Sequence, residues 1–330
     1  MIRESNPDGL DRRQFLGRLA KAGVAAATAC AAGAWLHDPK GPDGVKDASS
    51  DHVALDFSID APGPNMSIVR GEDRVATLRT ALKSLGGIET FVQKGDRVLL
   101  KINAAFASPA MLSATTHPAV ITEMARLCYQ AGAASVVVTD NPINDPASCF
   151  ALTGIADAAR KAGARVVLPG AGTFRPMTVK KGKLIRNWPV LIEPFRGITK
   201  VIGMAPLKDH HRSGASMIMK NWYGLLGGRR NIFHQDVHTI ILELAMMVTP
   251  TLAILDATTA MMTNGPTGGS LSDLKNTHTM IVGTDQVAVD AFGASLLEKP
   301  LDALPFIGKA EAAGLGTADY RKLNPVMVSV

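Results

Sequence analysis

The chain has 330 residues, a formal net charge of +6 at pH 7 and 46% hydrophobic residues, which is enough length and apolar material for a large folded domain. Aromatic residues make up only 5% of the chain and do not cluster with the basic residues, which argues against a nucleic-acid-binding protein. The three cysteines form no Cys-x-x-Cys pair, so the sequence lacks a self-contained iron–sulfur or zinc-ribbon motif.

Residues 1–34 have the layout of an export signal. Arg12-Arg13 precedes Gln14-Phe15-Leu16, a pattern that resembles a twin-arginine signal, and an Ala- and Gly-rich run extends from Ala22 to about Ala34. At roughly 13 to 15 residues this run is shorter than the ~20 needed for a stable transmembrane helix, which favours a cleaved signal. We therefore expect the twin-arginine translocase as a partner, a periplasmic or otherwise exported protein, and membrane contact only through the signal.

A linker and one α/β domain are expected after the signal. Residues 35–62 contain several Asp, Pro and Gly with little periodicity, as linkers do, and the domain is expected at residues 63–330. Short β-branched runs predict strands at Ser67–Val69, Arg97–Ile102, Ser135–Thr139, Arg165–Leu168, Lys200–Ala205, Leu252–Leu255 and Met280–Val282. Helical patterns lie at Arg74–Leu85, Pro118–Ala131, Gly154–Ala162, Val237–Met247 and Val287–Leu297.

Two of these helices end in the same way. Gln130-Ala131-Gly132-Ala133 and Lys161-Ala162-Gly163-Ala164 each stop a helix at glycine and lead into a Val-rich strand. Such repeated βα units predict an α/β fold with a largely parallel sheet flanked by helices, and a ligand crevice at the carboxyl ends of the strands.

Polar residues follow the main predicted strands, where the crevice should lie. They are Lys101 with Asn103, Asp140-Asn141, Lys208, Asp256 and Thr284-Asp285. Each one alone is equally well explained as a turn residue or a helix cap, and Asp285 in particular fits the cap of the helix that starts near Val287. Because five strand ends agree, we expect these side chains to converge.

Two further segments carry groups suited to binding an anion. Thr116 and His117 stand before Pro118 at a predicted helix start, and helix N-termini are ready anion sites. The loop from Asn264 to Gly269 is rich in backbone donors, although it lacks the Gly-Lys-Ser/Thr of a Walker loop. We therefore count Gly265, Gly268 and Gly269, with Thr116 and His117, among the ligand-binding candidates.

Four of the eight histidines lie between Lys208 and His238. This stretch predicts an anion pocket in which Lys208, Lys220, His210 and His234 are the catalytic candidates, because neutral imidazoles and buried amines exchange protons near pH 7. Lys101, Asn103, Asn221 and Arg230 complete the ligand-binding set. His211 and His238 fit structural roles better. Schiff-base chemistry at Lys208 or Lys220 stays open, behind simple anion binding.

A divalent metal is the other open alternative. Its ligands would come from separate segments, because the chain has no His-Glu-x-x-His motif. The candidates are His210, His234, Asp140 and Asp256.

The order of these motifs resembles the domain of unknown function 362 family. The resemblance spans about Asp96 to Leu297, and its most specific part is the Lys-x-His at Lys208 followed by Lys220-Asn221-x-x-Gly224. Further residues that carry it are Leu99 to Asn103, Thr115 to Pro118, Asp140 to Pro142, Arg230, His234, Asp256, Gly265-Pro266, Gly269, Asp285 and Asp290.

The chain departs from this family pattern in two ways that matter for the pocket. Many members carry a ferredoxin-like cysteine segment that this chain lacks, so an iron–sulfur cluster is not carried over. Asp209 stands where the family has a small residue, and we expect its carboxylate beside Lys208 to change the charge of the pocket. The resemblance implies no general reaction.

The resulting expectation is an exported protein with a pocket for a small anionic ligand. Its cofactor is unknown, and a divalent metal is one alternative. Under this hypothesis the protein could be a periplasmic redox enzyme or a metal-dependent enzyme. The alternative is a non-enzymatic ligand-binding, metal-delivery or assembly factor. Cys128 and Cys149 fit core thiols, while a disulfide between them is left open by an oxidising compartment.

Overall fold

The computed structural model describes residues 12–36 and 51–330, in two units that join at residues 48 and 49. In the first unit, helix α1 (Arg12–Leu36) has exposed side chains wherever they are described. Its segment Phe15–Ala32 is long and apolar enough to cross a membrane, a test that N-terminal signal sequences also pass. The polar start at residues 1–11 and the linker residues 37–50 lie outside the described residues.

Within residues 51–330, nine strands form the main sheet, in the order β14-β3-β13-β12-β9-β4-β5-β6, with β10 paired to β9. Their bounds are β3 (Met66–Arg70), β4 (Arg97–Lys101), β5 (Ser135–Thr139), β6 (Arg165–Val167), β9 (Lys200–His210), β10 (Gly214–Ser216), β12 (Leu252–Met261), β13 (Leu274–Gly283) and β14 (Val326–Ser329). β12, β9, β4, β5 and β6 are mutually parallel, as are β14 and β3, whereas β13 runs against both of its neighbours. The predicted α/β fold with a largely parallel sheet is thus confirmed.

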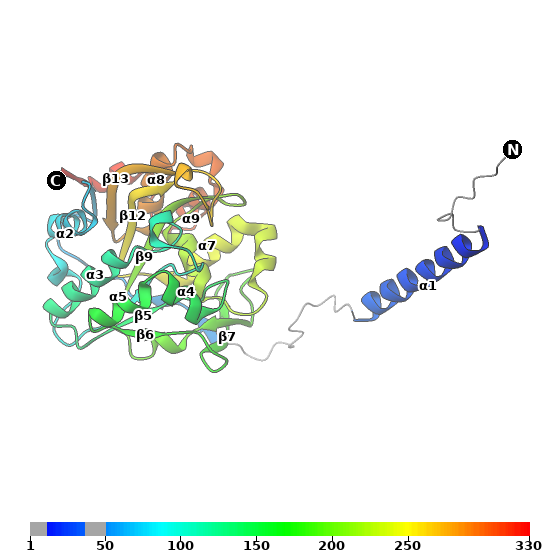
Figure 1. Cartoon of the computed structure of the whole chain (residues 1–330). Coiled ribbons are helices and arrows are strands. Elements are labelled where there is room, and N and C mark those ends of the chain that lie inside the picture. Colours follow the sequence, from blue (N-terminus) through cyan, green and yellow to red (C-terminus); the bar gives the residue numbers. More distant parts are fainter. Residues whose placement is uncertain (1–11, 37–50) are drawn as a thin grey trace. The chain divides into compact units, whose positions relative to one another are not determined.

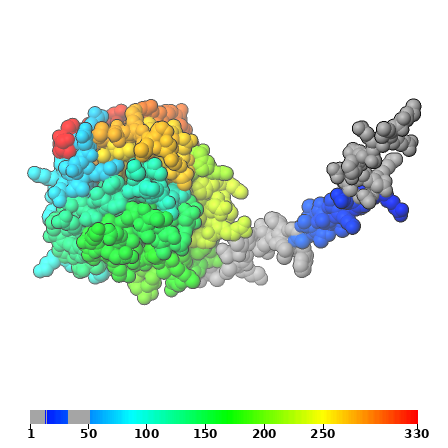
Figure 2. Space-filling view, viewed as in Figure 1, coloured from blue at the N-terminus to red at the C-terminus, as the bar shows by residue number. Residues whose placement is uncertain are grey.

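Helices cover both faces of this sheet, as Figure 1 shows. One face carries α2 (Arg74–Ser84), α3 (Pro118–Gln130), α4 (Pro146–Leu152) and α5 (Ile155–Lys161), and the other carries α6 (Ile218–Asn221), α7 (Val237–Met247), α8 (Gln286–Leu296) and α9 (Pro305–Ala312). In Figure 2 cyan and green atoms, the colours of the segment that carries the first group, fill much of the visible face of residues 51–330.

The sheet has a hydrophobic core on each face, and the alternation of side chains along β4 decides which of its residues belong to which core. Val98 and Leu100 belong to the core beneath α2, α3 and α5, whereas Leu99 belongs to the core beneath α6, α7 and α8. Lys101 is two residues after Leu99 and therefore points toward α6, a position that matters for the site.

The predicted elements all occur, and three strands are much longer than expected: β13 begins at Leu274 rather than Met280, and β9 and β12 extend past their predicted ends. β9 continues to His210 and β12 to Met261, because their polar residues still pair with neighbouring strands. The smaller sheet β1-β7-β8 was not predicted; it is formed by β1 (Asp51–Val53), β7 (Phe174–Val179) and β8 (Trp188–Leu191).

Two expectations need correction. Residues 51–56 fall in the predicted linker, but β1 pairs with β7, and β2 (Leu55–Asp56) pairs with β11 (Val248–Thr249), because Val53 is buried in the core. Asp285 does not converge with the other strand-end residues, since β13 is antiparallel; its carboxylate caps α8 by accepting from the backbone N–H groups of Val287 and Ala288.

Cys128 and Cys149 are buried free thiols.

Candidate functional site

A cavity of about 1160 Å³ opens at the carboxyl ends of β4, β5 and β9. Polar side chains reach it from the strand ends, from α6 and from the 3-10 helix Arg230–Asp236 that precedes α7. Of the sequence-predicted site residues, those that line it are Asn103, Asp140, Lys208, His210, Lys220, Asn221, Arg230 and His234. The predicted crevice and the observed cavity therefore coincide.

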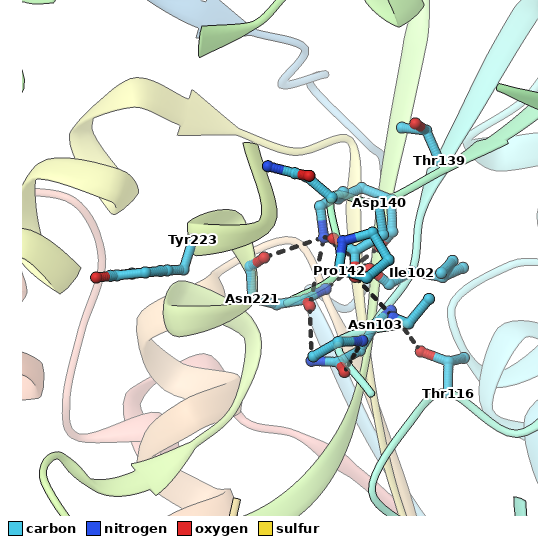
Figure 3. Close-up of polar contacts among 12 residues, drawn as sticks. Ile102, Asn103, Thr116, Thr139, Asp140, Pro142, Asn221 and Tyr223 are labelled. Atoms are coloured by element: carbon cyan, nitrogen blue, oxygen red, sulfur yellow. Dashed lines mark hydrogen bonds and ion pairs between the residues drawn. The ribbon is translucent and has the colours of Figure 1, made fainter. Parts of the chain in front are cut away.

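Beneath the cavity, Lys101 and Asp140 form a buried ion pair. Figure 3 shows Asp140 close to Asn221 and Asn103. The Lys101 Nζ atom lies 2.7 Å from Asp140 Oδ1 and donates to the backbone oxygens of Ile102 at 2.6 Å and Asn221 at 3.0 Å. The other oxygen, Asp140 Oδ2, accepts from Ala104 N at 2.7 Å. Lys101 was predicted to hold a ligand, but its side chain is fully buried and its hydrogen-bonding capacity is taken up by the protein.

Asn221 connects this ion pair to the strand ends. Its Nδ2 donates to the backbone oxygens of Lys101 and Met204, and its Oδ1 accepts from Asn103 Nδ2 at 3.1 Å. Thr116 extends the same network, because its Oγ1 accepts from Asn103 N and donates to Met204 O. Asn221 and Thr116 were expected to bind ligand, yet their polar atoms hold the cavity floor in place.

Gly224 is the position where backbone must approach the ion pair. A Cβ atom at Gly224 would lie 1.8 Å from Asp140 Oδ1 and 2.9 Å from Lys101 Nζ. No side chain fits there unless the pair moves. The glycine of the Lys-Asn-x-x-Gly motif is therefore explained by the space that the Lys101–Asp140 pair needs.

Lys208 and Lys220 present buried amines to the cavity. Lys208 Nζ donates to Ala114 O at 2.5 Å and lies 5.1 Å from the centre of the Phe106 ring. Lys220 Nζ lies 4.8 Å from the centre of the Tyr223 ring and forms no hydrogen bond with any residue that the structure describes. Burial lowers the pKa of each lysine to about 7, helped by the positive charge of Lys220 at Lys208 and of Arg230 at Lys220.

Asp290 places Lys220 in the cavity by capping the short helix α6. Its carboxylate accepts from Ile218 N at 2.8 Å and Met219 N at 3.0 Å. Burial raises the pKa of Asp290 to about 7, although these two hydrogen bonds oppose the shift. A four-residue helix has little stability of its own, so the position of Lys220 depends on this carboxylate, which belongs to α8.

The hydrogen bonds of His210 fix its tautomer. Its Nδ1 accepts from the backbone N–H groups of Arg212 at 3.1 Å and Ser213 at 3.3 Å, so in the neutral ring the proton is on Nε2. Burial, followed by the charge of Lys220, lowers the pKa of His210 to about 2. His210 is consequently a neutral donor, which corrects its predicted role as an acid/base group.

His234 has the opposite tautomer. Tyr223 Oη donates its proton to Arg230 O, so its contact of 3.1 Å with His234 Nδ1 requires the proton to be on that nitrogen. His234 Nδ1 also lies 3.3 Å from Asn231 O, which can only accept. Nε2 is therefore left as an acceptor, and burial followed by the charge of Lys220 lowers the pKa of the ring to about 4.

The rings of His211, His210 and His234 stack in a row, with centre-to-centre distances of 5.0 Å and 5.7 Å. His211 lines the cavity, although the sequence favoured a structural role for it. His238 does not, and its ring stacks on Phe306 instead.

Arg230 braces the cavity wall. Its guanidinium donates to four backbone oxygens, those of Tyr223, Leu226, Asn141 and Pro142, at 2.8–3.0 Å. These bonds tie the segment after β5 to the segment after α6. Arg230 was predicted to contact the ligand, but although it lines the cavity, its guanidinium donates to backbone oxygens and acts on the cavity through its positive charge.

Asp256 and His117 belong to the opposite face of the sheet. Asp256 Oδ2 pairs with Arg74 of α2 at 3.0 Å, and His117 Nδ1 caps α3 by accepting from Ala119 N. The reason is alternation along β12, in which Leu255 faces the α8 side and Asp256 the α2 side. Neither residue lines the cavity, so the structure does not bring them together with His210 and His234.

The glycines of the 264–269 loop shape its backbone. A Cβ atom on Gly265 would lie 1.9 Å from Asp209 O, and Gly268 has a φ of +58°. Pro266 and Thr267, rather than Gly265, Gly268 or Gly269, line the cavity. Asp209 pairs with Lys299 and accepts from Gly265 N, which corrects the expectation that its carboxylate retunes the pocket.

The four predicted metal ligands do not form one site. Asp140 is paired with Lys101, Asp256 faces the other side, and His210 uses Nδ1 as an acceptor, whereas a metal-bound histidine normally donates through its second nitrogen. Within residues 12–36 and 51–330, no group of three or more His, Cys, Asp or Glu side chains is placed to hold a metal ion.

Several cavity residues were missed from the sequence. Tyr223 lies within the Lys-Asn-x-x-Gly motif, three residues after Lys220, so the motif could have indicated it as a cavity residue. The apolar lining residues Phe106, Ile143, Phe174 and Ile232 come from four separate segments, and nothing local to each marks them as neighbours.

Comparisons with known proteins find a curated relative, a solved structure and a matching family model. The thylakoid-associated protein sll1697 of Synechocystis sp. is 26% identical over 254 residues, which cover 73% of this chain and 75% of that protein. The lactate racemase apoprotein of Thermoanaerobacterium thermosaccharolyticum is similar with a TM-score of 0.41 and 10% identity; the matched part covers 75% of this chain but only 61% of that one. The model of a domain of unknown function, DUF362, matches residues 98–295. Since this match covers more than half of the sequence, the chain belongs to the DUF362 family.

Proposed function

We propose that this protein binds an organic anion in the cavity at the strand ends. The observation that carries the proposal is that Lys208 and Lys220 face the cavity with no carboxylate partner. Among the described residues, Asp140 is the only carboxylate of the lining, and Lys101 already pairs with it. Buried amines without a counter-charge are costly to protonate, and an anionic ligand supplies that counter-charge.

The ligand is expected to combine an anionic group with an apolar body. A volume of about 1160 Å³ is at the upper end of small-molecule sites, far more than a carboxylate or phosphate group fills. Phe106, Ile143, Phe174 and Ile232 provide apolar surface in the same cavity. The cationic end would therefore hold the charged group while these side chains contact the remainder.

An enzyme is favoured over a non-enzymatic binding or assembly factor. The observation is the pairing of opposite tautomers: His210 offers Nε2–H as a donor, and His234 offers a bare Nε2 as a proton acceptor in the same cavity. A divalent metal is not part of the proposal, because His210 cannot ligate through Nε2 without losing its two backbone donors.

Replacing either pocket lysine with glutamine is expected to weaken anion binding by about tenfold to a hundredfold, the loss of one charge-assisted hydrogen bond. Calorimetry with benzoate, decanoate and inorganic phosphate measures this for Lys208→Gln and Lys220→Gln. Lys83→Gln, which changes an exposed lysine of α2, is the control and should bind like the wild type. Unchanged affinity in both pocket variants, with folding intact, rejects the anion site.

Anion binding is expected to weaken as the pH rises from about 7 to 9. The empty cavity holds both lysines with a pKa of about 7, whereas a bound anion favours their protonated forms, so binding takes up protons in this range. The affinity should fall by up to about tenfold per pH unit for each proton taken up. Calorimetry in buffers of different ionisation enthalpy detects the uptake, and heats that do not depend on the buffer would contradict it.

The same lysines make the stability of the empty protein depend on pH. Their folded pKa lies below the ordinary lysine value of 10.5, so between pH 7 and 10.5 the unfolded chain binds more protons than the folded one. Their contribution to the free energy of unfolding therefore rises with pH across this window.

We further propose that the protein is exported through the twin-arginine route. The supporting features are the Arg12-Arg13 pair and the exposed apolar helix α1. Changing both arginines to lysine is expected to leave the precursor in the cytoplasm, as fractionation and immunoblotting of the native host would show. Normal export of the double-lysine variant removes this route.

A further inference from the structure

We propose that Lys220 is a nucleophile that forms a Schiff base with the carbonyl carbon of a 2-oxo carboxylate bound in the cavity. This inference rests on the proposed anion site and deepens it by naming the substrate class.

The two pocket lysines differ in how their amines are held. Lys208 Nζ is tethered by a hydrogen bond of 2.5 Å to Ala114 O. Lys220 Nζ has no hydrogen-bond partner among the described residues and contacts the face of the Tyr223 ring. Lys220 as a whole is only 7% exposed and lines the cavity. A buried amine that faces a cavity and is free of hydrogen bonds keeps its lone pair available for attack on a carbonyl carbon.

The charges around Lys220 favour its neutral form. Asp140 is neutralised by Lys101, and Arg230, whose guanidinium is held by four backbone oxygens, contributes only positive charge. Burial and Arg230 lower the pKa of Lys220 to about 7, so about half of the amine is unprotonated at neutral pH.

The groups next to Lys220 favour a substrate that has a carboxylate next to its carbonyl group. Lys208 and His210 are two residues apart on β9, so their side chains share the face that lines the cavity. A protonated Lys208 and the Nε2–H of His210 together offer donors for one carboxylate. The carboxylate raises the pKa of Lys208 most, because it lies against that amine, so of the two like charges Lys220 is the first to lose its proton as the pH rises.

The covalent step balances without an oxidant or a reductant. The Lys220 lone pair forms a C–N bond to the carbonyl carbon, and the C=O π electrons move to oxygen. His234 Nε2 then carries two protons in turn from the nitrogen to this oxygen. The first converts the alkoxide to a hydroxyl group, and the second lets it leave as water while the nitrogen lone pair forms the C=N bond. The net change is amine plus carbonyl to imine plus water. The tautomer of His234, with its proton on Nδ1, is the one that allows this shuttle.

Reductive trapping tests the proposal. The full-length protein is incubated at neutral pH with pyruvate and sodium cyanoborohydride, which converts an imine to a stable secondary amine, and the adduct is located by intact-mass and peptide mass spectrometry. We expect one adduct per chain, on Lys220. Benzoate should compete with it, whereas Lys83→Arg should be labelled like the wild type.

Lys220→Arg is the decisive variant, because arginine keeps the positive charge but has no amine that deprotonates near pH 7. It should still bind pyruvate in calorimetry while losing the adduct. His234→Gln should slow trapping at least about tenfold at saturating pyruvate, as expected for loss of a proton shuttle.

The possible results separate the two claims. Pyruvate binding without an adduct, or an adduct that persists in Lys220→Arg or maps to Lys208, overturns the Schiff base and leaves the anion site standing. Absence of binding by pyruvate and by the other anionic probes overturns both.

Discussion

Asp140→Ala is expected to lower the free energy of unfolding by about 3–5 kcal/mol, because it leaves the Lys101 ammonium buried without its carboxylate. The remaining partners of Lys101 Nζ are neutral oxygens of Ile102 and Asn221. The variant also deprives Ala104 N of its acceptor. Urea denaturation followed by circular dichroism measures the loss.

Two controls separate this effect from the removal of a carboxylate in general. Asp157→Ala breaks the exposed pair with Lys161 in α5 and should have only a small fraction of the effect, because water and salt screen that pair. Lys101→Met combined with Asp140→Asn removes both charges and keeps an acceptor for Ala104 N, so it should recover much of the stability. Equal losses in Asp140→Ala and Asp157→Ala would show that the buried pair is not a stabilising element.

Gly224→Ala is expected to destabilise the protein by about 3 kcal/mol, at the upper end of typical overpacking costs. The added methyl group would overlap Asp140 Oδ1 at 1.8 Å and crowd Lys101 Nζ at 2.9 Å, so the ion pair has to separate or the segment has to move away. Thermal and urea unfolding measure the change. Since Asn141 N donates to Gly224 O, the cavity wall should shift as well, with weaker anion binding as a second readout.

The matched control is another glycine-to-alanine change. Gly308 is in the interior of α9 and has no atom within 4 Å of an added Cβ, so Gly308→Ala should raise stability by about 0.5–1 kcal/mol. Opposite signs at the two positions are expected. A Gly224→Ala protein as stable as the wild type would contradict the close approach described here.

These contacts explain the three parts of the Lys-Asn-x-x-Gly motif separately. Lys220 is the residue that faces the cavity, Asn221 joins the strand ends to the buried ion pair, and Gly224 makes room for that pair. Reading the motif as a set of ligand contacts therefore overestimates how many of its residues touch a ligand. The same holds for Lys101, Thr116 and Arg230, whose polar atoms serve the scaffold.

Much of the fold was predictable because its signals are local. The β-branched runs at Ser135–Thr139 and Lys200–Ala205 and the glycine stops at Gly132 and Gly163 depend only on neighbouring residues, and the structure has the corresponding strands and helix ends. The antiparallel direction of β13 was not predictable in this way, because a strand's sequence does not state which neighbour it joins. That single reversal removed Asp285 from the expected cluster.

The sequence by itself determined the order of the βα units. It also placed Lys208, His210, Lys220 and His234 in one cavity wall. Both were predictable because strand alternation, helix stops and motif order depend on residues that are close together along the chain. The tertiary structure alone decided which of the polar groups remain free. Lys101 meets Asn221 across 120 positions of sequence, and Asp256 meets Arg74 across 182. Whether a buried charge already has a partner depends on such distant residues. Only the folded arrangement therefore distinguishes Lys101, whose amine is paired with Asp140, from Lys220, whose amine has no hydrogen-bond partner among the described residues.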